Sequence, residues 1–230
     1  MCSMDNIRQI AELIVVGALL VSLVSSLRAQ SAASAPRRDT QIWNDLQIAL
    51  PVSDRVDLNL LGTLRLGQHV TRPVDERVGA GLTLRMDKYL TLAPTYLYSS
   101  TQPAPGHNSY EHRLTIPATV RFTIGKFTFS DRNQFERRIR HPQVDATRYR
   151  NRLQIEHPIK PGGLKLQLFA FDEVFYDWSV HDWVRNRFAL GASRRFNRHF
   201  TLDLYYLRQN DGRTNLGDLY VLGAVYRIRL

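Results

Sequence analysis

An alternation of apolar and polar residues runs through most of this chain and constrains its fold more than any other feature. From Ile42 onward the pattern resembles Val56-Asp57-Leu58-Asn59-Leu60, with an apolar residue at every second position. Successive side chains of a β-strand point to opposite faces, so a period of two predicts strands with unlike faces. We identify eleven such segments, separated by polar connections: 42–50, 56–68, 76–86, 89–99, 110–122, 127–138, 148–157, 164–174, 183–195, 200–209 and 216–230.

The two faces of these segments predict an all-β, antiparallel transmembrane β-barrel. The apolar face persists across nearly every segment, whereas a soluble sheet usually interrupts it at its edges. Tyrosines and phenylalanines on this face gather near the segment ends, as in the aromatic girdles of membrane barrels. The alternative is a soluble periplasmic, lipocalin-like binding barrel, in which the apolar face would point inward and the charges outward.

The connections predict the direction of the strands and their number. The connections 87–88, 123–126 and 196–199 are short, whereas 69–75, 100–109, 139–147 and 175–182 are longer. Outer-membrane barrels have short periplasmic turns and long outer loops, so the last strand should end in the periplasm. Antiparallel closure then requires an even number of strands. We predict ten wall strands with 42–50 as an extra segment, or twelve if one strand is missed.

Four polar residues interrupt the predicted lipid face: Asp131, Asn133, Arg137 and Asn151. A β-bulge could turn these side chains away from the lipid. Alternatively, the hairpin that carries them extends beyond the membrane. Pro94 lies within a predicted strand and also indicates local irregularity, because proline cannot donate a ladder hydrogen bond.

The N-terminus reads as a cleavable signal peptide. The apolar run Leu13–Leu27 is too short for a comfortable helical span and is followed by small residues, with cleavage expected after Ala29. We therefore divide the chain into a signal peptide (1–29), a short linker (30–41) and an outer-membrane barrel (42–230). The alternative is an uncleaved inner-membrane anchor. Cys2 is the only cysteine, so the mature chain has no disulfide or cysteine-based metal site.

Several short motifs, in their order along the chain, resemble an outer-membrane family known as domain of unknown function 2490. They are Ile42-Trp43-Asn44-Asp45, Arg132-Asn-Gln-Phe-Glu136-Arg-Arg138, Tyr149-Arg-Asn-Arg-Leu-Gln-Ile-Glu156, Asp172-Glu173-Val-Phe-Tyr176, Asn186-Arg187-Phe-Ala-Leu-Gly191 and Leu204-Tyr-Tyr-Leu-Arg-Gln209. The resemblance implies an outer-membrane barrel of a Gram-negative bacterium and supplies no activity. The alternating strand that ends at Leu230 also resembles the signal read by the barrel-insertion machinery, although the usual last residue is Phe.

The polar face predicts a lumen rich in arginine. Nine arginines and three glutamates fall there: Arg65, Arg77, Arg113, Arg132, Arg138, Arg150, Arg152, Arg185, Arg187, Glu111, Glu136 and Glu173. The surplus of six positive charges favours anionic solutes, because the guanidinium fork suits carboxylates and phosphates. The same set could instead form a structural Arg–Glu network that stiffens a narrow barrel. Although the chain carries a net charge of +10, nucleic-acid binding is not expected, because these arginines alternate with lipid-facing residues.

An enzyme that hydrolyses or transfers acyl chains at the outer rim is the main alternative to a pore or a structural barrel. Such barrels place Ser and His near a carboxylate or amide, and His107, Asn108, Ser109 and Glu111 cluster in one connection, with His181-Asp182 in another. Loops are rich in these residue types, so we expect no catalytic site. The histidines lack metal-ligand spacing and no nucleotide motif is present, so no cofactor or metal is expected.

Overall fold

The computed structural model describes residues 38–102, 106, 108–212 and 217–230. The predicted signal peptide and most of the predicted linker lie outside these residues. Among the described residues, no helix is long and apolar enough to cross a membrane. The strands are β1 (Arg38–Ser53), β2 (Val56–Gly67), β3 (Arg72–Arg85), β4 (Leu90–Leu92), β5 (Thr95–Thr101), β6 (Ser109–Ile124), β7 (Phe127–His141), β8 (Ala146–Ile159), β9 (Leu166–Asp177), β10 (Asp182–Arg195), β11 (Phe200–Asp211) and β12 (Asp218–Arg229). A 3-10 turn, η1 (Pro161–Gly163), precedes β9.

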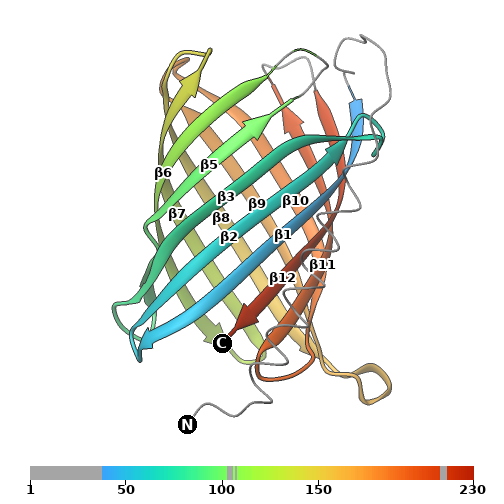
Figure 1. Ribbon diagram of the computed structural model, residues 1–230. Coiled ribbons are helices and arrows are strands. Elements are labelled where there is room, and N and C mark those ends of the chain that lie inside the picture. Colours follow the sequence, from blue (N-terminus) through green and yellow to red (C-terminus); the bar gives the residue numbers. More distant parts are fainter. Residues whose placement is uncertain (1–37, 103–105, 107, 213–216) are drawn as a thin grey trace, which may run out of the picture.

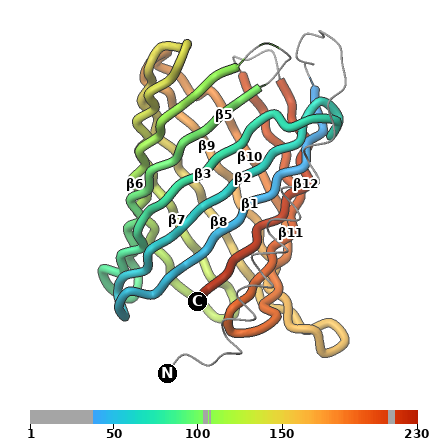
Figure 2. The backbone as a smooth tube through the Cα atoms, viewed as in Figure 1, coloured from blue at the N-terminus to red at the C-terminus, as the bar shows by residue number. Residues whose placement is uncertain are grey.

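The strands form a closed, tilted barrel (Figures 1 and 2). Consecutive strands pair antiparallel, and β4 and β5 together occupy one position in the wall, because both pair with β3 on one side and with β6 on the other. The break between them falls at Ala93-Pro94, where the proline has no N–H to donate. The irregularity predicted at Pro94 is therefore confirmed.

The barrel closes through a parallel pair. β1 pairs with β12 in parallel register, for example Asn44 with Ala224, and with β2 in antiparallel register. The wall thus has eleven strand positions, so the prediction of ten strands and its alternative of twelve were both wrong. The prediction assumes antiparallel closure, but a parallel ladder also satisfies the backbone groups of both strands. The segment 42–50 is part of the wall, and its strand already begins at Arg38, within the predicted linker.

The two ends of the barrel differ less in loop length than predicted. The lower end in Figure 1 carries the connections 54–55, 86–89, 125–126, 160–165 and 196–199 and the C-terminal Leu230. The upper end carries the connections 68–71, 142–145 and 178–181, and β5 and β11 end there. Strands extend into several segments that were predicted to be long upper loops, for example β7 to His141 and β9 to Asp177. These extensions shorten the upper loops, because residues counted as connections belong to the ladder.

The outer surface of the barrel is apolar. Val78, Ile116 and Leu222 expose 62%, 59% and 59% of their surface, whereas Glu136 and Glu173 are completely buried inside. The predicted assignment of the two faces is confirmed. A lipocalin-like barrel has the opposite arrangement, so that alternative is wrong.

Aromatic side chains gather at both ends of the apolar surface. Near the upper end, the rings of Phe135 and Trp178 stack with centroids 5.9 Å apart. Near the lower end, Phe122 stacks on Phe129 at 5.6 Å. Two aromatic belts that border an apolar band are typical of barrels that cross a membrane.

The interior is divided into an apolar side and a charged side. Strands β1 and β9 to β12 contribute a buried apolar cluster: Trp43, Phe171, Ala189, Leu207, Leu219 and Val221. The ring of Tyr205 lies against Gly223, where any Cβ would collide with it. Glycine is required at this position because the ring approaches the backbone so closely.

The polar residues on the outer face bind one another. The Asn151 side-chain amide donates to Asp131 at 2.6 Å and to Asn133 at 3.1 Å, and the Tyr149 hydroxyl also donates to Asn133. The register between β7 and β8 is continuous across these positions, so the alternative of a β-bulge was wrong. Arg137 lies near the upper end, where it bonds with Asp145 at 3.0 Å.

Candidate functional site

The lumen contains a cavity of about 940 Å³ lined by residues from all around the wall. The predicted lumen arginines Arg65, Arg77, Arg113, Arg132, Arg138, Arg150, Arg152, Arg185 and Arg187 all line it, as do Glu111 and Glu136. Glu173 is completely buried behind the arginines that contact it. Strand periodicity therefore placed each of these side chains on the correct face.

Sequence reasoning missed three lumen arginines and most of the lumen carboxylates. Those missed are Arg140, Arg148, Arg227, Asp39, Asp45, Asp75, Asp177, Asp203 and Asp211. Within the described residues, twelve arginines thus face nine carboxylates, Glu173 included, and the excess of three is smaller than the predicted six. Extending the period of two a few residues past the predicted strand ends would have found Asp39, Asp75, Asp177 and Asp211.

Glu136, on β7, is the first centre of the charged side. Its Oε2 atom accepts from Arg148 Nη2 at 2.7 Å and from Arg148 Nε at 3.1 Å. Its Oε1 atom accepts from Arg150 Nη1 at 2.7 Å and from the Gln134 amide at 2.8 Å. Arg148 is the direct cross-strand partner of Glu136 on β8, so the register between these strands builds the pair.

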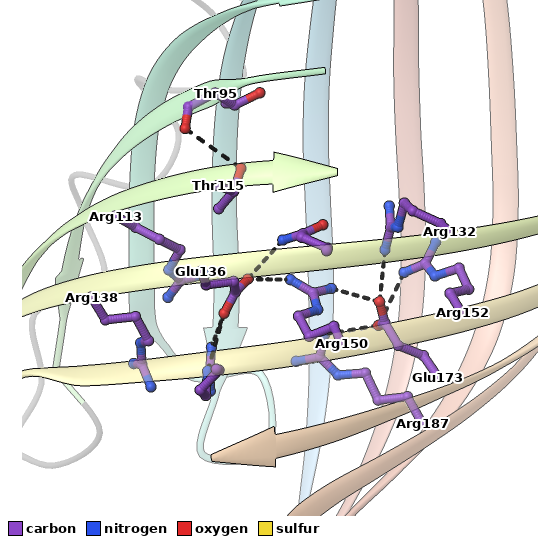
Figure 3. Close-up of polar contacts among 12 residues, drawn as sticks. Thr95, Arg113, Thr115, Arg132, Glu136, Arg138, Arg150, Arg152, Glu173 and Arg187 are labelled. Carbon is purple, nitrogen blue, oxygen red and sulfur yellow. Dashed lines mark hydrogen bonds and ion pairs between the residues drawn. The ribbon is translucent and has the colours of Figure 1, made fainter. Parts of the chain in front are cut away.

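Glu173, on β9, is the second centre. Its Oε1 atom accepts from Arg132 Nη2 at 2.6 Å and from Arg150 Nη2 at 2.7 Å. Its Oε2 atom accepts from Arg152 Nη2 at 3.2 Å, and Arg187 Nη1 lies 3.7 Å away. Arg150 therefore bridges the two glutamates, one with each terminal nitrogen (Figure 3).

Smaller ion pairs surround these two centres. Glu111 accepts from Arg138 at 2.8 and 2.5 Å and from Arg113 at 2.7 Å. Asp75 binds Arg77 and lies 3.3 Å from Arg65. Further pairs join Arg185 with Asp211 and Arg227 with Asp203. These pairs add to the charged lining, in which Arg150 joins the two centres.

Aromatic rings from the apolar side support several arginines. The guanidinium carbon of Arg65 lies 3.7 Å from the centre of the Trp43 ring, and that of Arg152 lies 3.9 Å from the Phe171 ring. The Trp43 indole N–H donates to Gln41 at 2.7 Å. Guanidiniums that stack on aromatic faces gain cation–π attraction and lose side-chain freedom. The arginines are therefore positioned before any solute arrives.

The lumen arginines supply positively charged hydrogen-bond donors. Guanidinium groups offer several N–H donors in a fixed plane and stay positively charged. Among the described residues, no group of three His, Cys, Asp or Glu side chains could hold a metal ion.

The structure describes most of the residues considered for acyl chemistry. The Ser109 hydroxyl donates to Gln143 at 2.8 Å, and Glu111 faces the lumen between Arg113 and Arg138. His181 lies in the upper connection between β9 and β10 with a φ of 53°. His107 lies outside the described residues.

Comparison with solved structures finds two porins among its matches. An anion-selective porin from Comamonas acidovorans is 14% identical, with 76% of this chain and 54% of that porin covered and a TM-score of 0.40. The NanC porin, in a rhombohedral crystal form, is 12% identical, with 83% of this chain and 96% of that chain covered and a TM-score of 0.45. This chain thus spans about half the length of the Comamonas porin. Comparison with curated proteins gives no match.

Comparison with protein families confirms the resemblance carried by the sequence motifs. The model of a family described as a protein of unknown function, DUF2490, matches residues 40–219. This range runs from the third residue of β1 to the second residue of β12, and so includes nearly the whole wall. The chain therefore belongs to the DUF2490 family.

Proposed function

We propose that this protein is an outer-membrane β-barrel whose lumen admits small anions in preference to cations. The observation that carries the proposal is the excess of arginine over carboxylate along a cavity of about 940 Å³. Fixed positive charges that line a narrow, low-dielectric passage raise the local concentration of anions and oppose cations. We propose no catalytic role, in contrast to the alternative of acyl hydrolysis or transfer at the outer rim.

The outer surface supports the membrane location. Side chains such as Ile116 and Leu222 would face hydrocarbon, where a single Lys or Arg costs roughly 2–4 kcal/mol at the midplane. We propose that a cleavable signal peptide directs export and that the insertion machinery recognises β12 with its final Leu230. The lower end of the barrel would then face the periplasm.

Ion selectivity tests this function directly. We expect the protein to be recovered with the outer membrane. In a planar bilayer under a salt gradient, we expect a reversal potential whose sign shows that anions are more permeant than cations. Arg140 lines the lumen, so Arg140→Glu lowers the charge excess from three to one and should reduce this preference. The matched control is Arg208→Glu, because Arg208 is 56% exposed and binds Asp218 at the upper rim. Cation selectivity of the unaltered barrel would exclude the proposal.

A structural network is the second candidate, favoured by the complete burial of Glu136 and Glu173. Ion pairs from β7, β8, β9 and β10 meet at Glu173 and tie four neighbouring strands together across the lumen face. Such a network would stiffen the wall whether or not solutes pass. The two functions are compatible, because the cavity persists beside the network.

A further inference from the structure

Two arginines lie directly opposite each other in the lumen and share one carboxylate. Arg132 on β7 and Arg152 on β8 are direct cross-strand partners. Like charges in directly opposite positions of a sheet repel each other and destabilise the pairing. Glu173 contacts both guanidiniums, but from β9, where it is the partner of Arg152.

Glu173 cannot compensate all the positive charge around it. Both of its oxygens are already shared among four guanidiniums, those of Arg132, Arg150, Arg152 and Arg187. When Glu136 and its second partner Arg148 are included, five guanidiniums surround two carboxylates, which leaves three positive charges in excess. Buried charges are ordinarily paired, so this part of the lumen lacks anionic groups.

Arg132 and Arg152 are the members of this cluster that reach the cavity most freely. Their side chains are 27% and 23% exposed, compared with 13% for Arg150, 9% for Arg187 and 7% for Arg148. Both line the cavity, and the Nε atom of each is buried without a hydrogen-bond partner. In Figure 3 both lie on the side of Glu173 that is away from Glu136.

We propose that Arg132 and Arg152 form a binding site for the oxyanionic group, carboxylate or phosphate, of a small solute in the lumen. The proposal rests on the anion-favouring lumen proposed above and specifies the class of anion that this lumen would bind. A guanidinium presents two parallel N–H donors that match the two oxygens of a carboxylate or phosphate, whereas spherical chloride offers no such match. Binding would also relieve the repulsion between the two arginines. The site therefore prefers oxyanions to chloride at equal ionic strength.

Thermal unfolding of the folded barrel in detergent tests the site without requiring conduction. Unfolding is detected on gels by the loss of the mobility difference between unboiled and boiled protein. The probes are inorganic phosphate and acetate, and each is compared with chloride at matched ionic strength. We expect phosphate, acetate or both to raise the Tm of the unaltered barrel. In the double variant Arg132→Gln with Arg152→Gln, the apparent affinity should fall about tenfold or more, because two charge-assisted contacts are lost.

Arg121→Gln is the matched control. Arg121 belongs to β6, binds Glu156 at 2.7 Å, and its loss changes the charge without touching the proposed site. This variant should keep the oxyanion-dependent rise in Tm. A rise that persists in the double variant, or is absent from the unaltered barrel, would overturn the proposal.

Two further measurements separate this site from the proposed pore and from a structural role. A barrel that binds phosphate but carries no current would keep the site and exclude the pore, whereas anion current without an oxyanion-dependent Tm would exclude the site alone. Arg132→Gln removes the 2.6 Å ion pair with Glu173 and should lower the Tm in chloride, so each variant is compared with its own Tm in chloride. The site predicts that phosphate or acetate raises the Tm of Arg132→Gln less than that of the unaltered barrel. An equal rise in both would assign Arg132 to the structural network and would count against the site.

Discussion

At the scale of residues, two buried glutamates organise the lumen. An ionised carboxylate accepts about four hydrogen bonds, and Glu136 and Glu173 each have partners on both oxygens. Removing such groups from water is expensive, and only close, hydrogen-bonded partners offset that penalty. The surrounding arginines are also removed from water, and their contacts with the carboxylates offset that cost in the same way. The stability of the charged side thus depends on a few residues and not on the total count of ion pairs.

Replacing Glu173 with Gln should therefore destabilise the barrel strongly. The amide keeps the size of the side chain but leaves four guanidiniums facing a neutral group, and breaking a buried pair costs about 3–5 kcal/mol. Glu156→Gln is the control, because its partner Arg121 is 55% exposed and such pairs contribute about 1 kcal/mol or less. Urea titration followed by gel mobility measures both free energies of unfolding. Equal losses of unfolding free energy in the two variants would show that burial does not make the ion pairs of Glu173 stronger than the exposed pair of Glu156.

At the scale of elements, each strand has a face for lipid and a face for the lumen. On β2, Leu60 is 43% exposed on the outer surface, while its neighbour Asn59 points inward and donates to Thr83 at 2.8 Å. The cluster of Asp131, Asn133 and Asn151 on β7 and β8 departs from this rule, and its side chains satisfy one another by hydrogen bonds. The loss of stability caused by a charged residue therefore depends on whether its position faces the lipid or the lumen.

Adjacent positions on β2 test this difference in one strand. Leu60→Arg places a charge against lipid and should lower the free energy of unfolding by roughly 2–4 kcal/mol. Asn59→Arg places the same charge in the hydrated lumen at nearly the same depth and should cost far less. Refolding into lipid vesicles with a urea titration provides the comparison. If both variants lose the same stability, the two faces are not in lipid and water as described.

At the scale of the whole molecule, the parallel seam between β1 and β12 sets the geometry of the chain. Arg38 begins β1 at the upper end, whereas Leu230 lies at the lower end (Figure 1). Every other neighbouring pair in the wall is antiparallel, so β1 and β12 run in the same direction and close an odd-numbered barrel.

Engineered cysteines can detect the parallel seam. Ile48 and Ile228 are register partners across it, so Ile48→Cys with Ile228→Cys should form a disulfide under mild oxidation, in a background with Cys2→Ser. Leu60 is the β2 partner of Ile48 and lies one strand further away, so Leu60→Cys with Ile228→Cys should stay reduced. Mass spectrometry of the folded barrel shows which of the two cysteine pairs has formed a disulfide. Crosslinking of only the second pair would mean that β2, and not β1, closes the barrel against β12.

The period of two predicted the all-β class and showed which residues share a face. The persistence of the apolar face and the aromatic residues near the strand ends then predicted the apolar exterior and placed residues such as Arg150 and Glu173 in the lumen. Side-chain direction is a local property of a strand, so a few neighbouring residues reveal it. The missed carboxylates Asp75 and Asp177 lie at strand ends, where polar residues also suit loops and the local pattern is ambiguous.

Closure and pairing could not be predicted in this way. Arg38 meets Asp218 across the seam, and no local pattern records a contact between residues so far apart in the chain. Arg150 reaches both Glu136 and Glu173 because the registers of β7, β8 and β9 bring the three side chains together. Alternation reports the face on which a residue lies, whereas its partner depends on how distant strands align. The number of strands and the charge excess of the lumen therefore became visible only in the assembled barrel.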